Sequence, residues 1–260
     1  MATADPAPAA GGAGVWRLGL LLIAGVLVLT DLFLIFSYAP TERTMGVVQR
    51  LFYFHVPVIL TSFLSFALAA ACSVYYLVRR DRACDRLAYA SAEVGVVFFT
   101  VAIITGAIWA KPVWGAWWVW DANGTLTFVL WLIFIGCLMA RAYAPDAERG
   151  RRWAAVTAII GAATVPFVYM AADWWGGLHP ERVTGPGAQG SLEREMLLTL
   201  LFSFVAFIVL FASLIAERYA LRGDEEAVEE LRLAALDLPL TASNPAIPAQ
   251  AEISQPPDRT

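Results

Sequence analysis

Six long apolar stretches run along the chain, and charged or turn-forming residues collect between them. The stretches cover about residues 15–38, 56–78, 92–110, 126–143, 153–172 and 196–216. A helix needs about 20 predominantly apolar residues to cross a bilayer, where no water can satisfy open backbone groups. The pattern therefore predicts an all-α integral membrane protein with six transmembrane helices.

Composition supports a membrane protein and excludes several other classes. Of the 260 residues, 59% are hydrophobic and 15% are charged, and the mean hydropathy is +0.64. The apolar share is well above that of soluble domains. A net charge of −4, with basic residues scattered in short clusters, disfavours nucleic acid as a partner. The three cysteines form no C-x-x-C pair, so neither a redox pair nor a cysteine-based zinc cluster is indicated.

Arginine in the short connecting loops predicts the orientation of the helices. Cytoplasmic loops carry an excess of Lys and Arg. The loops between spans two and three and between spans four and five, with the end of span four, hold Arg79, Arg80, Arg82, Arg86, Arg141, Arg149, Arg151 and Arg152. The alternate loops carry one or two basic residues each. With an even number of spans, both termini are expected in the cytoplasm.

The ends of the chain differ in composition from the apolar middle. Residues 1–14 are rich in Ala, Gly and Pro and are predicted to be disordered, before a membrane domain over residues 15–217. Residues 218–260 form a cytoplasmic tail that starts as a charged helix and ends in a Pro-rich unstructured run. A cleaved signal peptide is the competing interpretation of the first span. Its length and single basic residue, Arg17, favour an uncleaved helix.

Both histidines of the chain are predicted on the outer side. His55 lies just before span two in "RLFYFHVP", and His179 follows span five in "DWWGGLHPERV", each close to a proline. Either histidine alone fits an interfacial polar residue, but two imidazoles on one side can also be axial ligands of an iron porphyrin. An incomplete metal site is the third interpretation. Its further ligands would come from Asp121, Asp173 and Glu181.

The second external loop contains an unusual concentration of tryptophan. The segment "WGAWWVWDANG" holds Trp114, Trp117, Trp118 and Trp120 and then Asp121. An aromatic belt at the membrane interface explains one or two such rings, but it explains four within seven residues poorly. We interpret the segment as a broad indole surface for stacking on a flat ligand, with turns or close approaches at Gly115 and Gly124.

A flat, apolar macrocycle with an iron centre and carboxylate groups fits these features together. The indoles would cover a face or an edge, and His55 and His179 would bind the metal from opposite sides. Arg50 and Lys111 are the candidate cations for the carboxylates. For Arg50 a snorkelling position at the interface is an equal alternative.

These segments resemble the CcmC family of heme-handling membrane proteins of the bacterial cytochrome c maturation system. The carrying motif is the WWD segment, here "GAIWAKPVWGAWWVWDANGTLT". The resemblance extends to "MGVVQRLFYFHVP" and "DWWGGLHP" and covers about residues 15–217. Where the family typically reads "WDARLTS", this chain has Asn123 in the region of the arginine.

The resemblance implies a delivery or transport role for heme b at the outer face of the bacterial inner membrane. It implies handover to the heme chaperone CcmE, with the ABC transporter CcmAB and the small subunit CcmD as further partners. His55 and His179 match the family's iron ligands. The residues that match the WWD platform are Trp114, Trp117, Trp118, Trp120 and Asp121. The sequence offers no evident catalytic acid or nucleophile.

Three other functions stay open at this point. A cytochrome c synthase would attach heme directly to apocytochrome, although such chains generally have more spans and histidines. A membrane cytochrome b usually places its histidines inside the spans. A permease for an apolar solute would draw attention to Asp31 and Glu93 within the apolar stretches, although Asp31 fits a structural hydrogen bond equally well.

Overall fold

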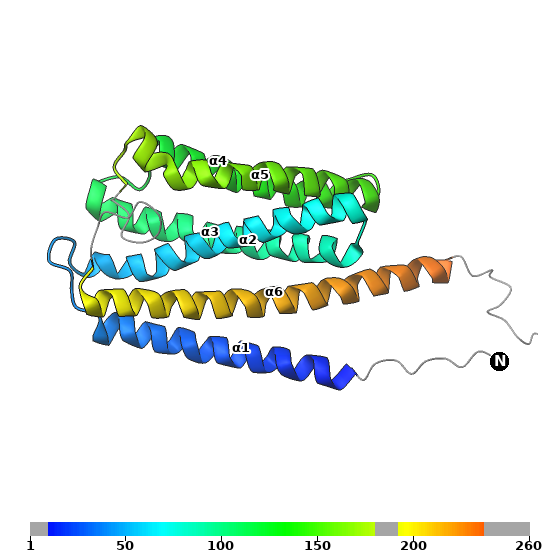
Figure 1. Ribbon diagram of the computed structural model, residues 1–260, viewed down its shortest axis with the longest axis horizontal. Helices are drawn as coiled ribbons and strands as arrows, with labels where there is room; N and C mark the ends of the chain where they lie inside the picture. The colour runs from blue at the N-terminus through cyan, green and yellow to red at the C-terminus, as the bar shows by residue number, and fades with distance from the viewer. Residues whose placement is uncertain (1–9, 180–191, 237–260) are drawn as a thin grey trace, which may run out of the picture. The chain divides into compact units, whose positions relative to one another are not determined.

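The computed structural model describes residues 10–179 and 192–236, in which all long elements are helices (Figure 1). These are α1 Ala10–Phe33, α2 Phe52–Arg79, α3 Arg82–Trp114, α4 Ala122–Ala142, α5 Ala147–Trp175 and α6 Arg194–Leu236, with a π-helical turn η1 Leu34–Tyr38 and a 3₁₀ turn η2 Val47–Leu51. Among these described residues, six helical segments are long and apolar enough to cross a membrane. The predicted all-α fold with six spans is confirmed.

The helix ends refine the expected boundaries. Helix α2 begins at Phe52, so His55 lies in the first turn of the helix and not just before it. The charged sequence after residue 216 continues α6 to Leu236. The chain forms two compact units, residues 1–220 and 221–260, and everything described below belongs to the first. Residues 1–9, 180–191 and 237–260, where most of the expected disorder falls, lie outside the described residues.

Helices α2 to α5 form the part of the fold that carries the candidate site. Helix α2 lies beside α3 and α4 lies beside α5 (Figure 1). At their centre the rings of Phe66 and Phe134 stack at 3.7 Å between centroids. A Cβ at Gly95 would lie 2.7 Å from the Phe66 ring, and one at Gly161 would lie 2.7 Å from the Phe134 ring. Glycine therefore permits the close approach of the helices here.

Side-chain contacts join α1 to α6 and α6 to α3. The buried Asp31 carboxylate on α1 accepts a hydrogen bond of 2.7 Å from Ser203 on α6. Arg218 on α6 donates to both oxygens of Glu93 on α3, at 2.6 and 2.8 Å. The two carboxylates that suggested a permease thus each bind a side chain of another helix, which fits a structural role.

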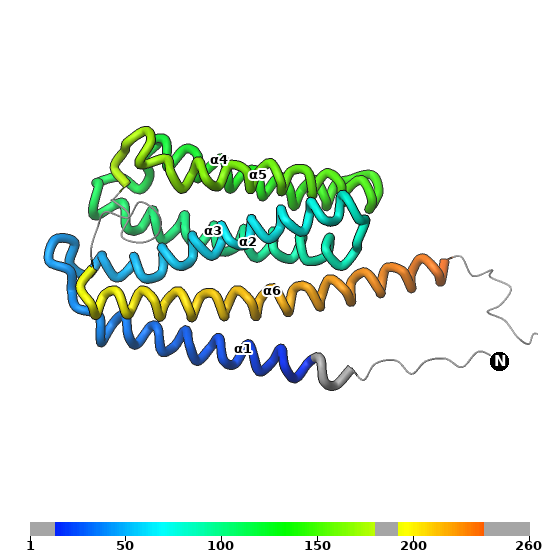
Figure 2. Tube along the Cα trace, viewed as in Figure 1, coloured from blue at the N-terminus to red at the C-terminus, as the bar shows by residue number. Residues whose placement is uncertain are grey.

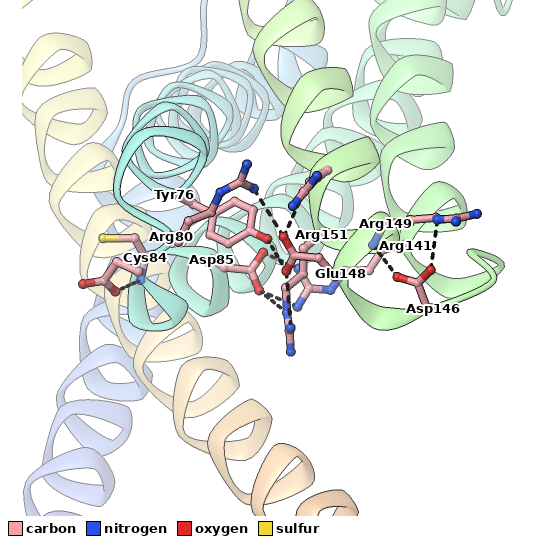
Figure 3. A network of polar contacts seen from close by, with 11 residues as sticks. Tyr76, Arg80, Cys84, Asp85, Arg141, Asp146, Glu148, Arg149 and Arg151 are labelled. Atoms are coloured by element: carbon pink, nitrogen blue, oxygen red, sulfur yellow. Dashed lines mark hydrogen bonds and ion pairs between the residues drawn. The ribbon is translucent and has the colours of Figure 1, made fainter.

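A network of polar contacts joins the helices at the end formed by the α2–α3 and α4–α5 loops (Figure 3). Arg141 donates to both oxygens of the buried Asp85, at 2.6 and 2.7 Å, and Arg151 lies 3.3 Å from the same carboxylate. Such two-pronged contacts between guanidinium and carboxylate are strong and directional. They tie α3 to both α4 and α5.

The same network continues toward solvent through Glu148 on α5. Its carboxylate accepts a hydrogen bond of 3.0 Å from the Tyr76 hydroxyl and is 2.8 Å from Arg152 and 3.3 Å from Arg80. The Glu148 side chain keeps 46% of its surface exposed, whereas Asp85 keeps 4%. The arginines that predicted the cytoplasmic side therefore also tie the helices together at this end.

The opposite ends of these helices lie beside different segments. Figure 2 shows the chain before η2 and the α3–α4 connection at that end, far from the α2–α3 and α4–α5 loops. Before η2, the Glu42 carboxylate accepts hydrogen bonds from the backbone N–H of Thr44, at 2.7 Å, and of Met45. These bonds stabilise the charged carboxylate and hold the pKa of Glu42 below its usual value.

Candidate functional site

A cavity of about 280 Å³ lies among α2, α3, α4 and α5, at the end away from the polar network. Helix α2 contributes residues 52, 55, 56, 59, 60 and 63, and α3 contributes residues 102, 103, 106, 109 and 110. Both sets follow the spacing of a single helix face. Most of these side chains are apolar or aromatic, so the cavity is suited to a largely apolar ligand.

His55 is held against α3 by its own ring nitrogen. Its Nδ1 lies 3.0 Å from the Ala102 carbonyl oxygen and 3.2 Å from the Thr105 hydroxyl. Because a carbonyl can only accept, Nδ1 carries the hydrogen and donates it, which leaves the lone pair on Nε2 for a ligand. A Cβ at Gly106 would lie 3.0 Å from the imidazole Cε1. The glycine therefore makes room for the ring beside α3.

His179 lines the same cavity from a different part of the chain. Helix α5 ends at Trp175, and Gly176 and Gly177 follow with φ angles of 70° and 141°. These conformations suit glycine and turn the chain back after the helix. The two histidines of the sequence, 124 positions apart, are thus brought to one cavity, by α2 and by the segment after α5.

Three of the four clustered tryptophans line the cavity: Trp114, Trp117 and Trp118. Trp114 ends α3, whereas Trp117 and Trp118 lie in the irregular segment between α3 and α4. Trp120 is 67% exposed and packs edge-on against Phe128 of α4, with 5.6 Å between ring centroids. The structure therefore does not place Trp120 on the cavity wall, and the other three rings supply the indole surface.

Two glycines shape the tryptophan segment, as the sequence predicts. Gly115 has a φ of 78° and ends α3, with its N–H donating to the Lys111 carbonyl at 3.0 Å. A Cβ at Gly124 would overlap the Val119 carbonyl oxygen. The first glycine therefore permits the turn and the second permits the close approach.

Asp121 lines the cavity and also binds two backbone groups. Its Oδ1 accepts the N–H of Gly124 at 2.8 Å and thereby caps α4. Its Oδ2 accepts the N–H of Leu178, the residue before His179, at 3.4 Å. The WWD segment and the histidine segment are connected at this carboxylate.

The two cations expected to pair with ligand carboxylates lie elsewhere. Lys111 Nζ donates to the Gly115 carbonyl at 2.9 Å, at the end of α3. Arg50 donates to the Phe36 carbonyl at 2.8 Å, and its guanidinium lies over the Phe36 ring. Neither is among the described residues that line the cavity. Their pairing with a ligand stays a prediction.

Several lining residues were not identified from the sequence. Trp109 lies one turn after Gly106 on the cavity face of α3, and its ring meets Trp114 edge-on at 5.0 Å. The spacing of residues 102, 106 and 109 was the available signal for it. Asn123, the departure from the family pattern, donates from its amide to the Val168 carbonyl at 3.2 Å and so joins α4 to α5. No sequence pattern indicated that contact.

A multidentate metal site receives no support from the described residues. Within residues 10–179 and 192–236, no group of three or more His, Cys, Asp or Glu side chains is placed to hold a metal ion. Glu181, one of the carboxylates considered for such a site, lies outside the described residues.

The family model and the individual relatives that match this chain indicate the same family. Residues 1–231 match the family model described as CcmC, heme exporter protein C. A heme exporter protein C of Bradyrhizobium diazoefficiens is 33% identical over 179 residues, covering 68% of each chain. Its namesake in Escherichia coli (strain K12) is 32% identical over 200 residues, covering 76% of this chain and 80% of the relative. A putative mitochondrial cytochrome c biosynthesis ccmC-like protein of Marchantia polymorpha is 30% identical over 173 residues.

Proposed function

Because the chain belongs to the family of heme exporter protein C, we propose that it binds heme between His55 and His179 and delivers it for cytochrome c maturation. One observation carries the proposal: the only two histidines of the sequence line one cavity. The family and the six apolar helices support a role in heme handling by a multi-pass protein of the bacterial inner membrane.

The residues around the cavity fit heme as cargo. Heme b supplies a flat, apolar macrocycle whose iron accepts two axial ligands. His55 has its tautomer set by the Ala102 carbonyl, as histidine ligands generally do through a second hydrogen bond. The rings of Trp114, Trp117 and Trp118 provide apolar surface beside it. The donor set is thus two imidazoles and an aromatic wall.

The arginine distribution supports an outward-facing site. The lining residues come from the start of α2 and α4 and from the end of α3 and α5. The arginine-rich network occupies the other ends of the same helices (Figure 3). Since arginine marks the cytoplasmic side, the cavity would face the periplasm. Heme bound there would be positioned for a periplasmic acceptor.

Exposure at the tryptophan segment supports handover of the cargo. Trp117 lines the cavity and is 59% exposed, and Trp120, three positions later, is 67% exposed. The segment with His179 is also exposed. An acceptor could therefore reach the site at both of these segments. By family resemblance the acceptor is the heme chaperone CcmE, and CcmAB and CcmD are the further components.

The test is absorption spectroscopy of the purified protein and of His55→Ala and His179→Ala. The wild-type protein should carry heme with a low-spin, six-coordinate spectrum. Each variant should lose this spectrum because one axial ligand is absent. Heme affinity should fall by at least about 100-fold for His55→Ala, more than for the loss of a supporting contact. Gly136→Ala is the control, because a Cβ at Gly136 meets nothing within 4 Å.

Three results would each contradict one part of the proposal. A wild-type protein that binds no heme in the presence of the other maturation components would contradict the assignment of heme as the cargo. A low-spin spectrum that persists in both histidine variants would remove the ligand assignment. Heme transfer to purified CcmE that proceeds equally well from all variants would remove the delivery role.

A further inference from the structure

We propose that Asp121 is a positioning residue for His179: its carboxylate latches the segment after α5 to the cavity and acts on heme only through that histidine. The inference rests on the proposed function, because it assigns His179 as a ligand. It gives the aspartate of the WWD segment a role in holding a ligand that lies 58 positions later in the sequence.

The two oxygens of Asp121 have separate tasks. Oδ1 accepts the Gly124 N–H at 2.8 Å and fixes the carboxylate at the start of α4. This anchored carboxylate then presents Oδ2 to the Leu178 N–H at 3.4 Å. Leu178 directly precedes His179, so the hydrogen bond restrains the backbone from which the imidazole projects. A charged acceptor strengthens a contact to a backbone N–H.

Gly177 allows the segment to come this close. A Cβ at Gly177 would lie 2.5 Å from Asp121 Oδ2, and its φ of 141° is a conformation that other residues rarely adopt. Gly176, with a φ of 70°, turns the chain away from α5 just before it. Both sides of the contact therefore permit it: the Asp121 carboxylate is fixed by its cap bond, and Gly177 has no side chain that would block the approach.

The two expected ligands differ in how they are held in place. His55 belongs to a helix, and its ring is bound to the Ala102 carbonyl of a neighbouring helix. His179 belongs to an exposed segment after the end of α5, and the N–H of the preceding Leu178 donates to Asp121 at 3.4 Å. Local opening costs less in an exposed segment than in a helix packed among others. The His179 side is therefore the one from which heme would be released.

Asp121→Asn separates the latch from the helix cap. Asparagine caps helices as well as aspartate does, so its oxygen still accepts the Gly124 N–H. The amide that replaces Oδ2 is a donor and cannot accept the Leu178 N–H. We expect the purified variant to shift from a low-spin toward a five-coordinate heme spectrum, as in His179→Ala, with about tenfold weaker heme binding.

A double variant distinguishes the latch from a direct contact. If Asp121 acts through His179, the pair Asp121→Asn with His179→Ala should show the spectrum and affinity of His179→Ala alone. Additional loss in the double variant would mean that Asp121 contacts heme itself and would overturn the inference. The matched control is Asp81→Asn, which changes the same type of cap at the start of α3, where Oδ1 accepts the Cys84 N–H at 3.0 Å.

Gly177→Ala tests the same contact by changing the backbone segment and leaving Asp121 unchanged. The added Cβ should displace the segment from Asp121 and reproduce the spectral shift without altering the carboxylate. Hydrogen exchange without heme gives a second readout: the peptide over residues 176–179 should exchange several times faster in both variants than in Asp81→Asn. Unchanged exchange together with an intact low-spin spectrum would overturn the latch. A wild-type protein without bound heme would instead contradict the proposed function.

Discussion

The two ends of the α2–α5 helices differ in what their side chains do. At one end Asp85, Arg141 and Arg151 form ion pairs in which each charge meets an opposite charge. At the other end His55, Trp114, Trp117 and Trp118 line a cavity of about 280 Å³. The charges at the first end are paired with one another. The imidazole Nε2 and the apolar walls at the second end are suited to a partner from outside.

This difference separates stability from function along one set of helices. A buried charge that loses its partner remains in a poorly solvated place. Removing a charged side chain at the ion-paired end should therefore lower stability strongly. The other end contains the cavity and an exposed tryptophan segment, so substitutions there should affect ligand binding more than folding. Variants at the two ends should therefore have opposite profiles in stability and heme binding.

The largest effect is expected for Asp85→Ala. Its side chain is 4% exposed, and its loss would leave Arg141 and Arg151 as like charges without their shared carboxylate. We expect a loss of about 3–5 kcal/mol in the free energy of unfolding, measured by denaturant titration in detergent. Heme bound per folded molecule should stay at the wild-type level. Unchanged stability would show that the network does not hold the helices together.

A smaller effect, on the ligand alone, is expected for Gly106→Ala. The added Cβ would lie 3.0 Å from His55 Cε1 and push the imidazole from its seat beside Ala102. We expect about tenfold weaker heme binding, as for other losses of support to a metal ligand, with little change in unfolding. Gly136→Ala, which adds the same methyl group in open space, should bind heme as the wild type does. Equal affinities in the two variants would contradict this seating of His55.

The smallest effect is expected for Glu148→Gln. Glu148 belongs to the same network as Asp85, but its side chain is 46% exposed, so water screens its contacts to Arg80 and Arg152. We expect a change below about 1 kcal/mol in the free energy of unfolding, decreasing further at high salt. A loss as large as that of Asp85→Ala would mean that burial does not decide the strength of these pairs.

Much of the membrane architecture is predictable from single positions and their spacing. The six spans follow from apolar length, because the bilayer leaves a spanning chain no other way to satisfy its backbone. The turn at Gly115 and the close approach at Gly124 also follow from residue type, since glycine alone tolerates both. These inferences needed no knowledge of which helices are neighbours.

The contact partners of individual side chains were not predictable in the same way. Arg50 and Lys111 have the right charge to bind a carboxylate, yet each donates to a backbone carbonyl, because a turn or a helix end nearby exposes one. Trp120 has the same side chain as Trp118 but packs on Phe128, because the segment between α3 and α4 is irregular and follows no helix face. Residue type did not distinguish these positions.

The sequence alone therefore determined the number of spans, the family and the residue types that a heme site needs, since these depend on local composition and motif. Tertiary structure alone decided that His55 and His179 share a cavity, that Ala102 sets the tautomer of His55, and that Asp121 contacts the backbone beside His179. Each of these contacts joins residues at least 47 positions apart. Their meeting depends on how the helices pack, and no local pattern encodes that packing.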